Sequence, residues 1–252
     1  FNTEGSAGGA AYVSFDNVQV GRTMAEVLEP AIDALGVDTP KVVMQNGGEE
    51  DNNAFLFRDG YAETVDARVE AGDWELVADQ FTPAWDNAEA LTIAEQILVG
   101  AENDVNGWFA ANDGIANSVI AAIESAGLDP STIPVSGQDA TTAGIQNILL
   151  GKQAMSVYKP IADLAAVGAQ VALALRAGES VTDQTGDFSV IGIDADGKPT
   201  PDASGGVPYI ALNPIALTAD NILETVIADD FSSIEEICTG EVAETDFCVE
   251  NG

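Results

Sequence analysis

Six polar or aromatic side chains occupy positions from which they could bind one small polar molecule. The pattern is clearest at Asp139, which follows the short run 133–136 of a predicted strand and precedes the apolar-periodic start of a predicted helix. An aspartate at the carboxyl end of a parallel strand lies at the edge where open α/β sheets bind ligands. Five more residues end other predicted strands or follow them closely: Asn53, Arg58, Trp85, Asn112 and Lys159.

These residue types match what a sugar requires. Each sugar hydroxyl donates and accepts hydrogen bonds, and amide, carboxylate, guanidinium and ammonium groups satisfy it at fixed angles. Arg58, Asp139 and Lys159 would supply the stronger, charge-assisted bonds. The apolar C–H face of a pyranose packs on an indole. Trp85 is the candidate for that contact, although a tryptophan in a loop can also serve only to pack the loop.

Several of these side chains also have a simpler structural explanation. Asp139 and Asn112 could each cap the helix that follows. Arg58 could form a surface ion pair with Asp51 or Asp59. A shared site is therefore expected only because these residues have a common placement at the ends of strands.

Strand and helix alternate at least five times, which predicts an open, mostly parallel α/β sheet with helices on both faces. We expect helices at 54–71 and 220–228, and Pro30 to bend or end the first helix. Two further strands, at 188–193 and 207–212, are expected to pair. We expect a tight turn at Asp194–Gly197 in place of a calcium loop, because the later ligands of such a loop are missing. The strands expected in the alternating part are 11–15, 41–45, 74–78, 107–111, 133–136 and 154–158.

Composition excludes several classes of function. The 42 acidic residues outnumber the 8 basic residues and give a net charge of −34, which repels phosphate backbones and argues against a nucleic-acid partner. Histidine is absent, which removes Ser-His-Asp and Cys-His catalysis and most zinc sites. We expect no metal and no cofactor. A chain of 252 residues with 46% hydrophobic content can form one large or two modest domains.

Both cysteines lie near the end of the printed sequence. The close spacing of Cys238 and Cys248 predicts a disulfide, worth about 3 kcal/mol in the loop-entropy model. A disulfide indicates a location outside the cytoplasm.

Motifs in order along nearly the whole chain resemble the xylose-type sugar-binding proteins of ABC transporters, which are type I periplasmic binding proteins. Any one motif is weak, but together they are specific. The motifs are Tyr12–Asn17, Asp51–Ala54 with Phe57–Arg58, Ala111–Gly114, Ser136–Ala140 and Val157–Pro160.

The resemblance implies two α/β lobes joined by three crossings, near 15–17, 158–159 and 203–209. Residues 1–16 and 159–206 would form part of an N-terminal lobe, and residues 17–158 and 207–252 the C-terminal sugar-binding lobe. Members of the family begin with a further segment that builds most of the first lobe. The hydrogen-bonding residues would be Asn53, Arg58, Asn112, Asp139 and Lys159, with Trp85 as the stacking aromatic.

The function implied is that of a binding protein and not of an enzyme. It would capture a monosaccharide, xylose or a related aldose, close around it and deliver it to the membrane permease of an ABC transporter. We expect a monomer in the periplasm or at the cell surface, where a lipid anchor on a preceding segment could hold it. Two alternatives are the ligand core of a sugar-responsive transcription regulator and a glycosidase with a carboxylate pair such as Asp51 and Asp139.

Overall fold

The computed structural model describes residues 11–179, 188–193, 199–200 and 209–252. The Asp194–Gly197 turn, and the crossing expected at 203–209 as far as residue 208, lie outside the described residues. The chain forms two compact units. The first unit comprises Phe1–Asp16 and Lys159–Pro214, and the second unit comprises Asn17–Tyr158 and Ile215–Gly252.

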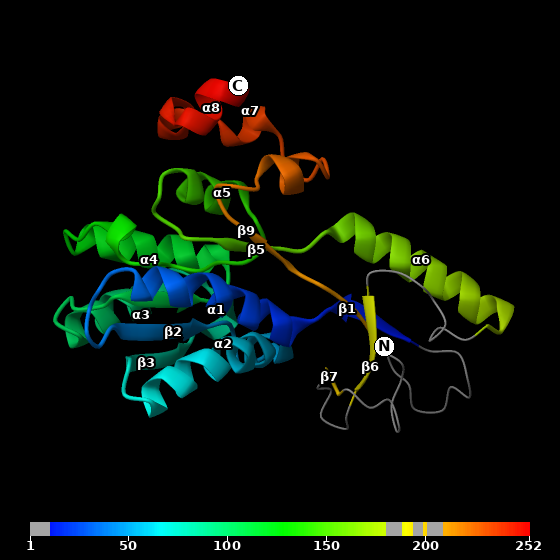
Figure 1. Ribbon diagram of the computed structural model, residues 1–252, viewed down its shortest axis with the longest axis horizontal. Coiled ribbons are helices and arrows are strands. Elements are labelled where there is room, and N and C mark those ends of the chain that lie inside the picture. Colours follow the sequence, from blue (N-terminus) through cyan, green and yellow to red (C-terminus); the bar gives the residue numbers. More distant parts are fainter. Residues whose placement is uncertain (1–10, 180–187, 194–198, 201–208) are drawn as a thin grey trace. The chain divides into compact units, whose positions relative to one another are not determined.

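A parallel sheet forms the centre of the second unit (Figure 1). Its order is β3-β2-β4, so that β2, with five of its six residues buried, lies between two parallel neighbours. Beyond these strands, β5 pairs with β9 in antiparallel fashion. The strands of this unit are β2 (Lys41–Asn46), β3 (Glu75–Phe81), β4 (Gly107–Ala110), β5 (Ser156–Tyr158) and β9 (Ile215–Leu217).

The strand expected at 133–136 is reduced to isolated bridges. Val135 pairs in parallel with Trp108 on β4, and Gln138 pairs in parallel with Val157 on β5. Pro134 has no N–H to donate, which limits the ladder that this segment can form. The segment still lies between β4 and β5 and connects their backbones.

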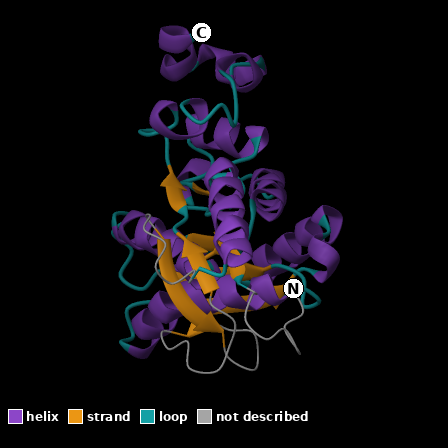
Figure 2. Ribbon diagram, turned by 90° about the vertical axis from the view of Figure 1, so that its right-hand side faces the viewer, coloured by secondary structure: helices purple, strands orange, loops and turns teal. Residues whose placement is uncertain are grey.

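Helices cover both faces of the β3-β2-β4 sheet (Figures 1 and 2). On one face, residues of α1 and α2 such as Leu28 and Tyr61 pack against Met44 of β2. On the other face, residues of α3 and α4 such as Leu98 and Ile123 belong to one core with β2 and β4. The helices are α1 (Asn17–Asp33), α2 (Asn52–Glu70), α3 (Asn87–Gly100), α4 (Asp113–Ser125) and α5 (Thr142–Leu149).

Two helix predictions need correction. Of the two effects expected of Pro30, ending the first helix is wrong, since α1 continues to Asp33. The helix expected at 220–228 is one wide π-helical turn, Leu223–Ile227.

The C-terminal segment consists of short helical turns and loops (Figure 2), including α7 (Ile234–Ile237) and α8 (Asp246–Asn251). The predicted disulfide between Cys238 and Cys248 is present and joins these turns. Cys248 also belongs to a core shared with Tyr158 at the end of β5. The C-terminal turns are therefore anchored to the sheet.

The first unit contains a four-stranded sheet of order β1-β8-β6-β7. Strand β8 is parallel to β1 and antiparallel to β6, which confirms that the two late segments pair. Helix α6 packs on this sheet through Val171 and Ala174 around Ile210. Among the described helices, none combines the length and apolar character that a membrane span requires. The elements are β1 (Tyr12–Phe15), α6 (Ile161–Ala177), β6 (Phe188–Ile193), β7 (Pro199–Thr200) and β8 (Tyr209–Leu212).

Candidate functional site

The carboxyl ends of β2, β3 and β4 define one edge of the sheet of the second unit. These strands run parallel and end at Asn46, Phe81 and Ala110, where Asn46 pairs with Phe81 and Gln45 pairs with Ala110. Trp85 follows β3 after a short loop, and Asn112 follows β4. The edge where open α/β sheets bind ligands therefore carries two of the predicted residues.

Three more predicted residues reach the same edge along the chain. Asn53 and Arg58 lie in the first turns of α2, which begins a few residues after β2 ends. Asp139 directly follows Gln138, whose parallel bridge continues the order of the sheet. Lys159, the sixth predicted residue, belongs to the first unit.

Trp85 is held against the sheet by two neighbours. A Cβ atom at Gly47, just past β2, would lie 2.0 Å from the indole Cζ2, so the ring lies directly on the backbone there. The ring of Phe57 meets the indole edge-on, with centroids 6.4 Å apart and planes at 68°. The side chain is only partly buried. Trp85 thus packs its loop and also presents indole surface to solvent.

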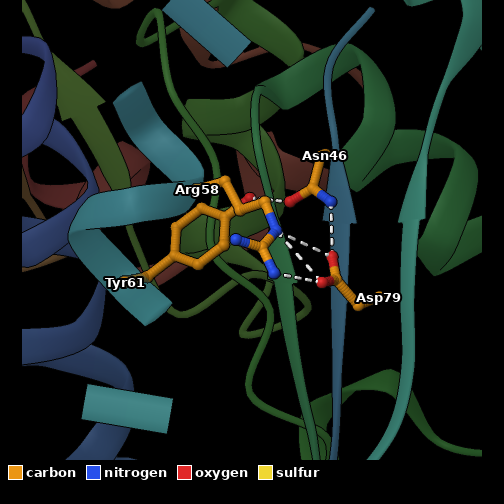
Figure 3. Close-up of polar contacts among 4 residues, drawn as sticks. All are labelled: Asn46, Arg58, Tyr61 and Asp79. Atoms are coloured by element: carbon orange, nitrogen blue, oxygen red, sulfur yellow. Dashed lines mark hydrogen bonds and ion pairs between the residues drawn. The ribbon is translucent and has the colours of Figure 1, made fainter. Parts of the chain in front are cut away.

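Arg58 pairs with Asp79 on β3 (Figure 3). It does not pair with Asp51 or Asp59, the partners that the sequence suggested. Its Nε donates to both carboxylate oxygens, at 3.0 and 3.2 Å, and its Nη2 also donates to the carboxylate. The hydrogen bond to Asp79 is the main cause that raises the pKa of Arg58. The guanidinium is therefore a fixed cation, with a position set by β3.

Two further side chains complete the group drawn in Figure 3. Asn46 donates to the Asp79 carboxylate at 2.7 Å and accepts a hydrogen bond from the hydroxyl of Tyr61. Tyr61 is fully buried, and this burial raises its pKa, so the hydroxyl stays protonated as a donor. Asn46 thus holds the Asp79 carboxylate in place from the core side, and Arg58 pairs with the carboxylate in that position.

Asn53 and Asn112 each use the side-chain oxygen to fix local structure. The Oδ1 atom of Asn53 accepts from Nδ2 of Asn17 at 2.8 Å. The Oδ1 atom of Asn112 accepts from the backbone N–H of Ile115 at 2.9 Å, which is the cap of α4 that the sequence allowed. An amide also carries two N–H donors. Accepting a hydrogen bond through the oxygen therefore leaves each side chain able to donate to a ligand through its N–H groups.

Asp139 does not cap a helix. Helix α5 begins later and is capped by Thr141, whose side chain accepts from Gly144 N–H at 3.0 Å. The backbone of Asp139 is left-handed, with φ at 95°, and that of Ala140 follows at 48°. Such conformations cost on the order of 1–3 kcal/mol each outside glycine and occur often at functional sites. The surrounding structure must therefore hold this segment in place.

A buried carboxylate beside this segment was not among the predicted site residues. Asp113, the first residue of α4, has no exposed surface. Burial raises its pKa to about 6, against the opposite effect of hydrogen bonds from Gln153, Thr141 and Ser156. The sequence offered one signal, an aspartate between an asparagine and a glycine at a strand end, but helix capping explained it equally well.

Comparison of the sequence with known proteins identifies relatives. The sequence profile of the family described as "Periplasmic binding protein domain" matches residues 1–180. The chain is 36% identical to the D-xylose-binding periplasmic protein of Haemophilus influenzae over 229 residues, which cover 90% of this chain and 62% of that protein. The corresponding protein of Escherichia coli is 35% identical, with 90% and 63% covered. The chain thus spans less than two thirds of the length of these relatives.

Solved structures show the same fold. An ABC transporter solute-binding protein from Clostridium phytofermentans, with bound beta-D-glucose, matches with a TM-score of 0.74 and 24% identity, covering 90% of this chain and 70% of that one. A carbohydrate transporter solute-binding protein from Agrobacterium radiobacter, in complex with D-arabinose, matches with a TM-score of 0.66 and 22% identity, covering 86% and 64%. These matches confirm the predicted α/β fold, and the profile confirms the predicted resemblance. The chain belongs to the periplasmic binding protein domain family.

Proposed function

We propose that this chain is the sugar-binding part of an extracytoplasmic receptor that delivers xylose or a related aldose to an ABC transporter. The observation that carries the proposal is the partly exposed indole of Trp85, held by Gly47 and Phe57 at the carboxyl edge of the sheet. The two relatives with 35–36% identity are both named for binding D-xylose.

The side chains at this edge would make different kinds of contact with the sugar. Trp85 would pack on the apolar C–H face of the ring. Arg58, already charged and fixed by Asp79, would donate to hydroxyl oxygens, and the carboxylate of Asp139 would accept from hydroxyl hydrogens. Asn53 and Asn112 would add amide hydrogen bonds. We keep Lys159 as a sixth proposed contact.

The proposed location follows from the disulfide and from the relatives. A disulfide such as Cys238–Cys248 persists in oxidising compartments, and the two relatives are described as periplasmic. We propose that the receptor acts as a monomer in the periplasm or at the cell surface. The membrane permease would be its protein partner, and the acidic surface disfavours nucleic acid.

Calorimetry with xylose, glucose and ribose tests the proposal. We expect heat of binding from at least one of the three, with xylose the tightest. Trp85→Ala should abolish most of the affinity without unfolding the protein, and Trp85→Phe should retain part of it because an aromatic face remains. Tryptophan fluorescence supplies a second readout. Trp74 and Trp108 are 2% and 0% exposed, so a change on sugar addition would report Trp85. Absence of heat from all three sugars would count against the proposal.

A further inference from the structure

The buried carboxylate of Asp113 accepts four hydrogen bonds from three residues. Its Oδ2 accepts from the backbone N–H and the hydroxyl of Thr141, at 2.8 and 2.9 Å. Its Oδ1 accepts from Nε2 of Gln153 at 2.9 Å and from the hydroxyl of Ser156 at 2.8 Å. The start of α4 is thereby joined to the start of α5 and to β5.

The same residue fixes the backbone on both sides of Asp139. The N–H of Asp113 donates to the carbonyl of Gln138 at 2.9 Å. On the other side, Ser156 donates to Asp113 and accepts from the N–H of Ala140 at 2.9 Å. Gln138, Ala140 and Thr141 are thus tied to Asp113 directly or through one hydroxyl.

Two glycines make room for this carboxylate. A Cβ atom at Gly137 would lie 2.2 Å from Oδ1 of Asp113, and a Cβ atom at Gly144 would lie 2.2 Å from Oδ2. The backbone of the segment that carries Asp139 therefore passes directly against the carboxylate. Side chains larger than hydrogen are excluded from both contacts.

These contacts explain how the left-handed backbone of Asp139 and Ala140 is held in place. Strained conformations persist only where the surrounding structure over-determines them. The hydrogen bonds centred on Asp113 surround the strained pair on both sides. Asn112, the other predicted ligand residue nearby, precedes Asp113 in the chain, so the same residue also fixes its position.

We propose that Asp113 is a positioning residue for sugar binding, which holds Asp139 and Asn112 in the geometry that the ligand requires without touching the ligand. This inference rests on the proposed function of the edge at which both residues lie. Asp113 acts through the hydrogen bonds to Thr141 and Ser156 and through its own backbone.

Asp113→Asn is the most direct test, because it keeps the size of the side chain. An amide presents one oxygen and one NH₂ group, so two of the four donors would face another donor. We expect sugar affinity to fall about tenfold or more. Ser156→Ala, which removes one donor to Asp113 and the acceptor for Ala140, should weaken affinity in the same direction but less. Asp129→Asn is the matched control, because Asp129 is exposed and caps a separate turn.

A double-mutant cycle separates positioning from general destabilisation. Calorimetry with xylose would compare Asp113→Asn in the wild-type background and in an Asp139→Asn background. If Asp113 acts through Asp139, its substitution should cost much less affinity once Asp139 is changed. Equal losses in the two backgrounds would overturn the proposal, as would an unchanged affinity in both Asp113→Asn and Ser156→Ala.

Hydrogen exchange of the sugar-free protein distinguishes this inference from the proposed function. The amides of residues 139–141 should exchange faster in Asp113→Asn than in wild type or in Asp129→Asn. Unchanged exchange would refute the role of Asp113 whatever the protein binds. Faster exchange in a protein that binds none of the sugars would refute the sugar receptor and, with it, the positioning of a sugar ligand.

Discussion

Arg58 on α2 and Asp79 on β3 form an ion pair in which both carboxylate oxygens accept from the same guanidinium. The two side chains are 29% and 25% exposed, so the pair lies at the boundary between core and solvent. Pairs this accessible contribute little to stability. Their geometry is fixed all the same, because Asn46 holds Asp79 from the buried side (Figure 3). We infer that the main effect of Asp79 is to direct the guanidinium.

The first prediction concerns the role of Asp79 in orienting the guanidinium of Arg58. Asp79→Ala should lower the free energy of unfolding by about 1–3 kcal/mol, because the fully buried Asn46 loses the acceptor for its side-chain N–H. It should lower sugar affinity almost as much as Arg58→Ala does, because the guanidinium loses its fixed position. Urea denaturation and calorimetry measure the two effects. Glu63→Ala, which breaks the exposed ion pair with Arg22, is the control and should leave affinity unchanged.

A second prediction concerns the backbone beneath Trp85. Gly47→Ala adds one methyl group, and that group would lie 2.0 Å from the indole, so the ring must move. We expect a clear loss of sugar affinity although no proposed ligand residue is altered. Gly100→Ala is the matched control, since a Cβ atom there meets nothing within 4 Å. Equal affinity of Gly47→Ala and wild type would show that the orientation of the indole does not matter for binding.

The alternating strands and helices of the fold could be predicted from the sequence. Buried apolar runs predicted β2 and β4, and two cysteines in an otherwise cysteine-free chain predicted the disulfide. The segment around Val135 was harder, because it makes bridges on both sides without forming a regular strand. Composition alone does not distinguish such a segment from a strand.

The candidate site was also predictable only in part. Strand ends indicated which residues lie at the edge, since that follows from the topology of a parallel sheet. The partners of those residues did not follow, because they are distant in sequence. Asp79 is 21 residues from Arg58, and Ser156 is 43 residues from Asp113. Only the folded chain brings these pairs together.

A third prediction concerns the disulfide. Cys238 and Cys248 are 10 residues apart, and closing a loop of this size stabilises the folded state by about 3 kcal/mol in the chain-entropy model. Reduction should lower the melting temperature and accelerate hydrogen exchange of residues 232–252 before that of β2 and β4. A Cys238→Ser/Cys248→Ser double variant should resemble the reduced protein and should not respond to reductant. Identical exchange of the C-terminal residues with and without reductant would contradict this expectation.

The last prediction concerns the pH dependence that Asp113 adds to stability. Its pKa is about 6 in the folded protein, against 3.8 for an ordinary aspartate, and the side chains that donate to it, Thr141, Gln153 and Ser156, are neutral. Between these two values the unfolded chain loses the proton and the folded protein keeps it, so stability falls as pH rises. The free energy of unfolding of wild type relative to Asp113→Asn should therefore decrease between pH 4 and pH 7, by on the order of 3 kcal/mol. Urea denaturation across this range measures the difference.

Asp129 supplies a control of opposite sign for the pH dependence of Asp113. Hydrogen bonds from Ser131 lower the pKa of Asp129, so the stability of wild type relative to Asp129→Asn should fall as the pH is lowered. A wild-type advantage over Asp113→Asn that stays constant or grows with pH would show that hydrogen bonding, and not burial, dominates at this carboxylate.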